Sequence, residues 1–256
     1  MDNKEATLQL GTQPVGKLLL QYAMPAIVAM MAASLYNIVD SVFIGQRVGP
    51  MAISGLAITF PFMNLASAFG AAVGVGASTL ISVKLGQKDY KTAENILGNT
   101  ISLNLIIGIG FSIVSLLFLN PILRFFGASE ATLPYARDYM LIILGGNVFS
   151  HMYFGMNAVL RAASKPRQAM YATIFTVAMN TLLDYIFIVE FGWGIQGAAY
   201  ATILAQVMAL IWQLHIFSNK KELLHFHSLS SRVNSKGFSR KALIFSFFLY
   251  SIHPFY

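Results

Sequence analysis

The sequence predicts an all-α membrane protein, a polytopic bundle of six transmembrane helices. Of the 256 residues, 56% are hydrophobic and only 11% are charged, and the mean hydropathy is +0.64. Ordinary soluble domains carry about 25% charged residues. The apolar residues also gather into long runs that short polar segments separate, which is typical of helices that cross a bilayer.

Six runs carry about twenty or more residues each, enough to cross roughly 30 Å of hydrocarbon at about 1.5 Å per residue. Turn-forming Gly, Pro, Asn and Asp residues occupy the segments between them. The predicted spans are 17–44, 51–83, 96–119, 135–160, 170–189 and 195–217. Pro25 removes one backbone hydrogen bond from the first span, so we expect a helix kink there.

The polar ends complete the expected organisation. Residues 1–16 are polar and of mixed charge, without the apolar core and cleavage site of a secretory signal, and should form a short cytoplasmic segment. Residues 17–217 form the transmembrane unit. Residues 218–256 form a basic cytoplasmic tail, whose final apolar run of about fifteen residues is too short to predict a further crossing.

The basic residues predict the orientation in the membrane. With a cytoplasmic N-terminus, only Arg47, Arg124 and Arg137 of the 17 Lys and Arg residues fall on the outer side. The positive-inside rule therefore favours both termini in the cytoplasm. Because the basic residues are distributed as topology signals, the net charge of +7 does not indicate nucleic-acid binding.

The sequence shows few of the residue patterns that enzymes use for catalysis. It contains no cysteine, which excludes disulfides and thiolate metal sites. It shows no convincing nucleophile–base pair, metal-binding cluster or phosphate-binding loop. Gly70 and Gly74 in the second span have GxxxG spacing, which predicts close approach of a neighbouring helix.

Two acidic residues, Asp40 and Asp184, lie well inside predicted spans, while the others fall in loops or near span ends. A charged side chain at the bilayer centre costs roughly 2.5 to 3.5 kcal/mol on insertion scales, so such residues usually face a protein interior. Asn180 lies one turn before Asp184 on the same helical face. Thr202, early in the sixth span, offers a hydroxyl at similar depth.

Three interpretations of these residues remain open. Two carboxylates, an amide oxygen and a hydroxyl suit a hard cation, so Asp40, Asn180, Asp184 and Thr202 are candidate Na⁺ ligands. The carboxylates could instead exchange protons, as intramembrane acids do in pumps and transporters. The third interpretation is purely structural, with hydrogen bonds that only fix the helices. No cofactor other than the Na⁺ or H⁺ is expected.

Several segments resemble the multidrug and toxic-compound extrusion (MATE) family, in matching order over residues 14–217. YNIVDSVFIGQRVG and AISGLAITFPF resemble the family's first helix and the entry to its second. KLGQKDYKTAEN and AVLRAASKPR resemble the loops after helices two and four, and GWGIQGAAYATILAQ resembles the entry to helix six. Ala163 and Ser164 depart from the glycine that many relatives carry nearby, which affects a loop only.

The resemblance implies an antiporter in a cell membrane, the inner membrane of a bacterium, that exports organic, often cationic, compounds while H⁺ or Na⁺ enters. It implies that Asp40 is central to coupling, with Asn180, Asp184 and Thr202 in the same site. It also implies a supporting polar network that includes Tyr139 and Asn157. Tyr36, one turn before Asp40, is a further candidate for that network.

The main difference from the family is length. The family's transporters have two six-helix lobes, and this chain has room for one. The resemblance therefore implies the N-terminal lobe of a truncated or frameshifted transporter. A complete pathway would need the missing second lobe or a second copy. Two alternatives stay open: a lipid-linked-sugar flippase of the wider superfamily, and a non-transporting membrane interaction protein.

Overall fold

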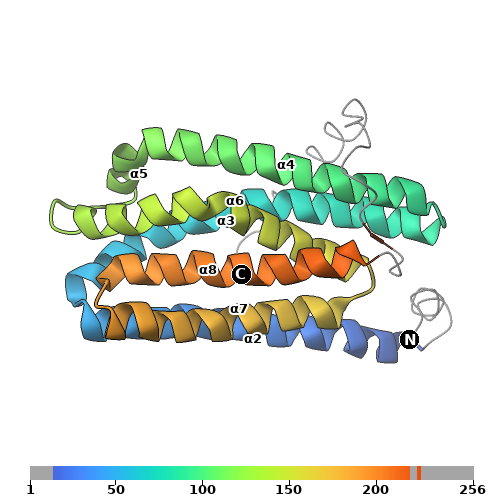
Figure 1. The fold of residues 1–256 in the computed structure, drawn as a ribbon, viewed down its shortest axis with the longest axis horizontal. Helices are drawn as coiled ribbons and strands as arrows, with labels where there is room; N and C mark the ends of the chain where they lie inside the picture. Colours follow the sequence, from blue (N-terminus) through green and yellow to red (C-terminus); the bar gives the residue numbers. More distant parts are fainter. Residues whose placement is uncertain (1–13, 220–223, 226–256) are drawn as a thin grey trace.

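The computed structural model describes residues 14–219 and 224–225, and it shows a bundle of long helices lying side by side (Figure 1). The elements are α2 (Val15–Arg47), α3 (Pro50–Gly86), α4 (Tyr90–Leu117), α5 (Leu119–Phe125), α6 (Leu133–Ala162), α7 (Pro166–Asp184), the π-helix η1 (Tyr185–Glu190) and α8 (Gly194–Ser218). The described residues contain no strand, so the all-α prediction is confirmed.

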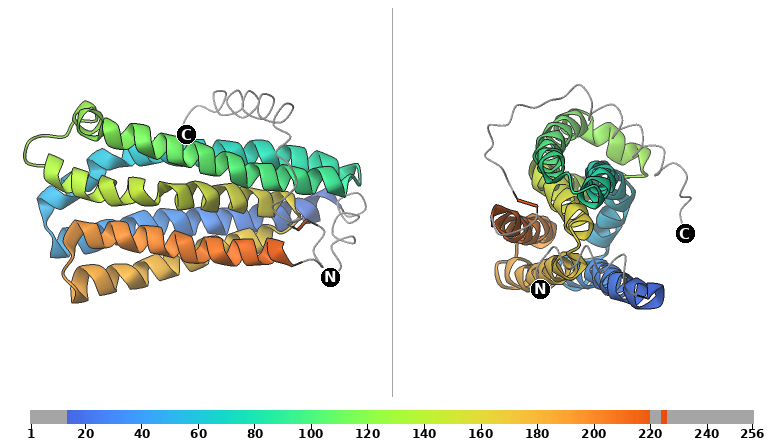
Figure 2. Two further views of the ribbon diagram at one scale, coloured as in Figure 1. Left: turned by 45° about the horizontal axis from the view of Figure 1, so that its top comes forward. Right: turned by 90° about the vertical axis from the view of Figure 1, so that its right-hand side faces the viewer.

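Each predicted span corresponds to one long helix, with α7 and η1 together forming the fifth. Five of these helical segments are long and apolar enough to cross a membrane, and α6 is the exception. The end-on view shows α6 in the middle of the bundle, where it contacts α3, α4, α7 and α8 (Figure 2). Because α6 faces protein on most sides, it carries buried polar residues such as Asn147 and His151 where a lipid-facing helix would be apolar.

The turns between helices follow simple local chemistry. Asp89 caps α4 by accepting a hydrogen bond from the backbone N–H of Thr92 (3.2 Å), and it lies 3.4 Å from Lys84. Contacts with Thr92 lower the pKa of Asp89, and Lys84 adds to this effect. Gly49 has φ +114°, a left-handed value that favours glycine between α2 and α3.

The short helix α5 was not predicted, because its Asn-Pro and the nearby glycine indicate a loop. Its Pro121 lies in the first turn, where the missing N–H costs no helical hydrogen bond. Leu119 and Leu123 are both buried and anchor α5 against the bundle. Arg124 on α5 forms an exposed ion pair with Glu130 (2.7 Å) in the following loop.

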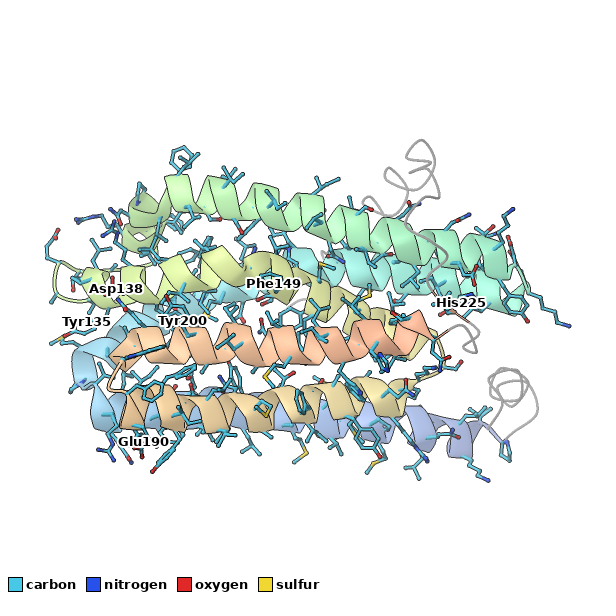
Figure 3. All side chains as sticks on the ribbon, viewed as in Figure 1. Tyr135, Asp138, Phe149, Glu190, Tyr200 and His225 are labelled. Atoms are coloured by element: carbon cyan, nitrogen blue, oxygen red, sulfur yellow. The ribbon has the colours of Figure 1, made fainter. Side chains whose placement is uncertain are left out.

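The two ends of the bundle are distinct (Figure 3). Tyr135, Asp138, Tyr200 and Glu190 lie at one end, where Asp138 accepts a hydrogen bond from Gln196 (3.1 Å). His225 lies at the other end, 3.1 Å from Glu94 on α4. The start of α2 and the end of α8 share the His225 end (Figure 1). This arrangement agrees with an even number of crossings. Most of 1–16 and of the tail 218–256 lies outside the described residues.

The contact between α3 and α6 depends on bare glycine backbone. A Cβ atom at Gly74 would lie 2.6 Å from the Cα of Gly155, and one at Gly70 would lie 2.8 Å from the Cα of His151. Real side chains do not fit at these distances, so the helices approach as closely as they do because both positions are glycine. The predicted role of Gly70 and Gly74 in close helix packing is confirmed.

We expect Gly74→Ala to destabilise the lobe by about 1–3 kcal/mol, because the added methyl group forces the α3 and α6 backbones apart. The thermal unfolding midpoint of the detergent-purified chain measures this effect. Gly110→Ala on α4 is the matched control, since its Cβ would meet nothing within 4 Å. Equal midpoints for the two variants would contradict the close α3–α6 contact.

Candidate functional site

Asp40 and Asp184 meet where α2 packs along α7. They are 2% and 0% exposed, and the two side chains lie close enough to influence each other. Asp40 Oδ1 and both carboxylate oxygens of Asp184 are buried without a hydrogen-bond donor among the described residues. Two carboxylates in this arrangement repel unless a proton or a cation lies between them.

Three hydroxyl groups surround the carboxylate pair. Tyr36 on α2 shares a 2.9 Å hydrogen bond with Thr202 on α8. Tyr139 on α6 is 1% exposed, lies beside Thr202 and is close to both carboxylates. Tyr36, Tyr139 and Thr202 thus lie near the carboxylate pair, at a place to which α2, α6, α7 and α8 contribute.

Asn180 supplies an amide group one turn before Asp184 on α7. It is 1% exposed, and neither amide atom has a hydrogen-bond partner within the described ranges. Buried polar groups are normally paired, so unpaired carboxylate and amide oxygens fit a site that holds an ion. Asp40, Asn180, Asp184 and Thr202 would offer Na⁺ a set of hard oxygen ligands, and the carboxylates alone would suffice for a proton.

Asn157 does not lie in this site. Its amide donates to the backbone carbonyl of Ala169 (3.1 Å) and to Thr173 (3.4 Å), and its oxygen accepts a hydrogen bond from Arg161. These contacts tie the end of α6 to the start of α7. The expectation that Asn157 belongs to the polar network around Asp40 is therefore corrected: Asn157 stabilises the α6–α7 turn.

The π-helix η1 was not predicted, because the sequence indicated one regular helix over 170–189. It begins at Tyr185, directly after Asp184, and ends at Glu190. π-Helical turns occur frequently at functional sites, where they change the register of the following residues. The residues YIFIVE carry no signal that distinguishes this turn from ordinary helix.

Pro25 lies in the interior of α2, which is helical from Val15 to Arg47. The kink that we predict at Pro25 stays a prediction. Pro25 lies about three turns before Tyr36 and about four turns before Asp40, toward the start of α2, so it is outside the carboxylate site.

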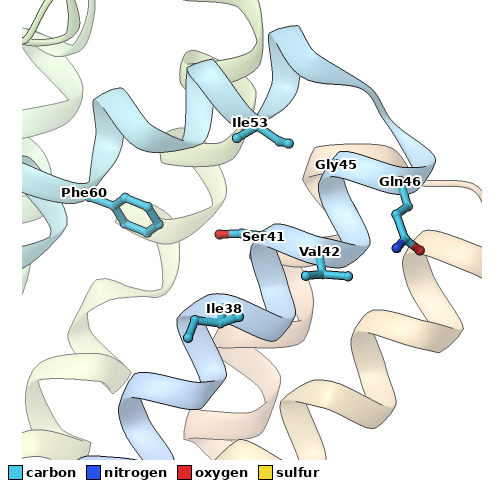
Figure 4. Close-up of a pocket in the computed structure, with 7 residues that line it drawn as sticks. All are labelled: Ile38, Ser41, Val42, Gly45, Gln46, Ile53 and Phe60. Carbon is cyan, nitrogen blue, oxygen red and sulfur yellow. The ribbon is translucent and has the colours of Figure 1, made fainter.

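A pocket of about 630 Å³ opens between α2 and α3 (Figure 4). Its lining is apolar apart from two side chains, and the lining residues are Ile38, Ser41, Val42, Gly45, Gln46, Ile53 and Phe60. Ser41 follows Asp40 directly along α2, with Asp40 facing α7 and Ser41 facing the pocket. Helix α2 alone therefore separates the pocket from the carboxylate pair.

Comparison with known proteins agrees with this architecture. Residues 25–186 match the family model described as MatE. The chain is 30% identical over 211 residues to the Multidrug export protein MepA of Staphylococcus haemolyticus (strain JCSC1435), covering 82% of this chain and 47% of that protein. It is 26% identical to the protein of the same name in Staphylococcus aureus (strain NCTC 8325 / PS 47), covering 88% of this chain and 50% of that protein.

Solved structures give the same result. A MATE crystal structure in the bent conformation is 25% identical, with a TM-score of 0.82, and the match covers 98% of this chain and 54% of the other. The outward-facing conformation of a multidrug resistance MATE family transporter is 25% identical, with a TM-score of 0.81. This match covers 96% of this chain and 52% of the other. The chain thus spans about half the length of the relatives it matches. It belongs to the MATE family of transporters.

Proposed function

We propose that this chain forms one lobe of an exporter of organic, often cationic, compounds, and that inward movement of Na⁺ or H⁺ drives the export. The buried pair of Asp40 and Asp184 carries this proposal, because the two side chains lie beside each other and three of their carboxylate oxygens lack donors among the described residues. An ion or proton that neutralises the pair also removes their repulsion. Binding at this site therefore has a direct energetic consequence for the fold.

Neutralisation of the pair should change the position of α2, because α7 is its main contact within the described bundle. A neutralised pair favours close packing of α2 on α7, whereas two bare carboxylates push the helices apart. Since α2 also forms one wall of the pocket, its movement would change the pocket's shape. Ion binding on one face of α2 would in this way alter organic-compound binding on the other.

The pocket supports an organic substrate of mixed polarity. Its walls offer Phe60 and aliphatic side chains for an apolar body, with Ser41 and Gln46 as polar contacts. The two staphylococcal relatives are named multidrug export proteins. The second lobe, or a second copy, would complete the pathway around the substrate.

The alternatives explain the site less well. If the polar residues only fixed helix packing, Asp184 and Asn180 should bond to their neighbours, yet no such bonds form within the described residues. A flippase for lipid-linked sugars would favour cationic side chains facing the interior of the spans. The Lys and Arg residues of the described helices lie near helix ends instead.

The role of Asn180 tests the Na⁺ version of this proposal. In a complete transporter containing this lobe, Asn180→Ala should raise the Na⁺ concentration for half-maximal efflux about tenfold, equivalent to roughly 1.4 kcal/mol. Efflux of a fluorescent organic cation from everted vesicles measures it. Gln196→Ala is the control, since Gln196 bonds to Asp138 at the bundle end. An unchanged Na⁺ dependence would remove Asn180 from the site.

We further propose that the His225 end of the bundle is cytoplasmic, as the positive-inside rule predicts. The chain lacks cysteine, so single cysteines can report accessibility. In intact cells, an impermeant thiol reagent should label Ala128→Cys and should label Lys88→Cys only after the membrane is opened. Labelling of Lys88→Cys from outside would reverse the orientation.

A further inference from the structure

Helices α7 and α8 lie side by side along one side of the bundle (Figures 1 and 2). Each carries a row of exposed side chains that are apolar or aromatic. On α7 and the start of η1, the exposed residues from 171 to 185 are Tyr171, Ile174, Phe175, Ala178, Leu182 and Tyr185. On α8, those from 200 to 212 are Tyr200, Leu204, Met208, Ile211 and Trp212. We name these two rows together the α7–α8 face.

Both rows begin and end with an aromatic side chain that carries a polar group. Tyr171 and Tyr185 are 54% and 47% exposed, and Tyr200 and Trp212 are 44% and 36% exposed. Tyr185 and Tyr200 lie six and seven residues from the connecting turn at 191–193, and therefore at a similar level. Tyr and Trp gather at membrane–water interfaces, because the ring suits an apolar layer and the O–H or N–H needs a polar partner.

Exposed polar residues lie just beyond both ends of each row. On α8 these are Gln196 and His215, which are about 28 Å apart along the helix at about 1.5 Å per residue. Along α7 and η1 they are Arg167 and Glu190, about 34 Å apart at the same rise. The hydrocarbon layer of a bilayer is roughly 30 Å thick. The exposed apolar part of the face thus has the length of one hydrocarbon layer.

One end of the face carries a cluster of aromatic rings. Trp193 stacks on Phe187 with ring centroids 5.0 Å apart, and it meets Tyr200 edge-on at 5.8 Å. Phe191 lies 5.5 Å from Trp193, and these two residues are 57% and 48% exposed. Tyr200 and Glu190 lie at this end of the bundle in Figure 3. Because large exposed rings are unfavourable in water, we expect the cluster to be covered.

We propose that the α7–α8 face contacts lipid directly, with the two bilayer boundaries at the two aromatic ends of its rows. One boundary lies at the level of Tyr185 and Tyr200, at the bundle end opposite His225. The other lies at the level of Tyr171 and Trp212. A protein partner would not require aromatic residues at two matched levels on both helices, whereas a layer of hydrocarbon between two layers of headgroups does.

The first boundary determines the depth of the carboxylate pair. Asp184 directly precedes Tyr185. Glu190, the first exposed polar residue beyond it on η1, is about 9 Å further along the helix. The pair therefore lies close to a bilayer boundary and away from the bilayer centre, so a coupling ion has a short distance to travel from that side. This consequence for the ion rests on the proposed function, whereas the lipid contact does not.

Fluorescence quenching by brominated lipids tests the boundaries, because the chain contains two tryptophans, Trp193 and Trp212. Trp212→Phe leaves Trp193 as the reporter, and Trp193→Phe leaves Trp212. In phosphatidylcholine vesicles, bromine near the headgroup should quench either reporter about twofold more than bromine near the chain end. With both tryptophans changed to Phe, Leu204→Trp should show the reverse order, since position 204 is 41% exposed in the middle of the α8 row. Met208→Trp, at a position that is 40% exposed, gives a second reading from the middle of the row.

Three results would overturn the proposal. Stronger quenching of Trp193 or Trp212 by the deep bromine would place the boundary elsewhere. Quenching of Trp193 by aqueous iodide and by neither lipid would place that end of the face in water. Quenching of Leu204→Trp and Met208→Trp by neither lipid would mean that protein covers the face. Because these measurements do not involve transport, a failure of drug efflux would count against the proposed function and leave the lipid contact standing.

Discussion

Asp40→Asn is expected to abolish ion-coupled efflux in a complete transporter that contains this lobe, while membrane insertion remains intact. The substitution keeps the approximate shape of the side chain but removes a charge and a proton-binding group. Asp184 would then lack the second carboxylate that lies beside it. Loss of the coupling ion should reduce driven efflux to the level of passive leak. Efflux from everted vesicles under an imposed Na⁺ or pH gradient measures the effect.

Asp138→Asn provides the matched control, because Asp138 lies at the bundle end and accepts a hydrogen bond from Gln196. It should keep normal coupled efflux. Expression of both variants in the membrane must equal that of the unmodified protein. Normal efflux with an unchanged pH and Na⁺ dependence in Asp40→Asn would show that Asp40 only packs α2 against α7.

The chain as a monomer is expected to give drug resistance no higher than an empty vector. One lobe presents the α2–α3 pocket on its surface, and alternating access needs a second unit that can close over the substrate from either side. Minimum inhibitory concentrations for organic cations in an efflux-deficient host measure this. Any efflux that the chain does support should come from a dimer. Strong efflux by a demonstrated monomer would contradict the single-lobe account.

The helices were predictable because a membrane span has a simple requirement, namely a long apolar run. That requirement located each long helix, including α6, whose buried polar residues reflect its central position. It did not locate α5 or η1. Leu119 and Leu123 make α5 stable by tertiary burial, and no local sequence rule marks the π turn after Asp184.

The site was predictable in part. The cost of burying a charge singled out Asp40 and Asp184, and helical spacing added Asn180. The proximity of the two carboxylates depends on α2 packing against α7, which no spacing rule gives. Asn157 shows the limit of resemblance, since its position in α6 matches the family pattern while its actual bonds go to Ala169, Thr173 and Arg161.

Ion-dependent thermal stability of the purified chain tests most directly whether Asp40 and Asp184 bind the coupling ion. An ion that binds only the folded state at a hundred times its dissociation constant stabilises by about 2.7 kcal/mol. We predict that Na⁺ at alkaline pH, or protons on acidification, raise the unfolding midpoint, because either relieves repulsion between the carboxylates. The shift should exceed that with K⁺ or an organic cation at equal ionic strength, and Asp40→Asn should lose it. A midpoint that responds to neither Na⁺ nor pH, or a shift that Asp40→Asn fully retains, would contradict the account.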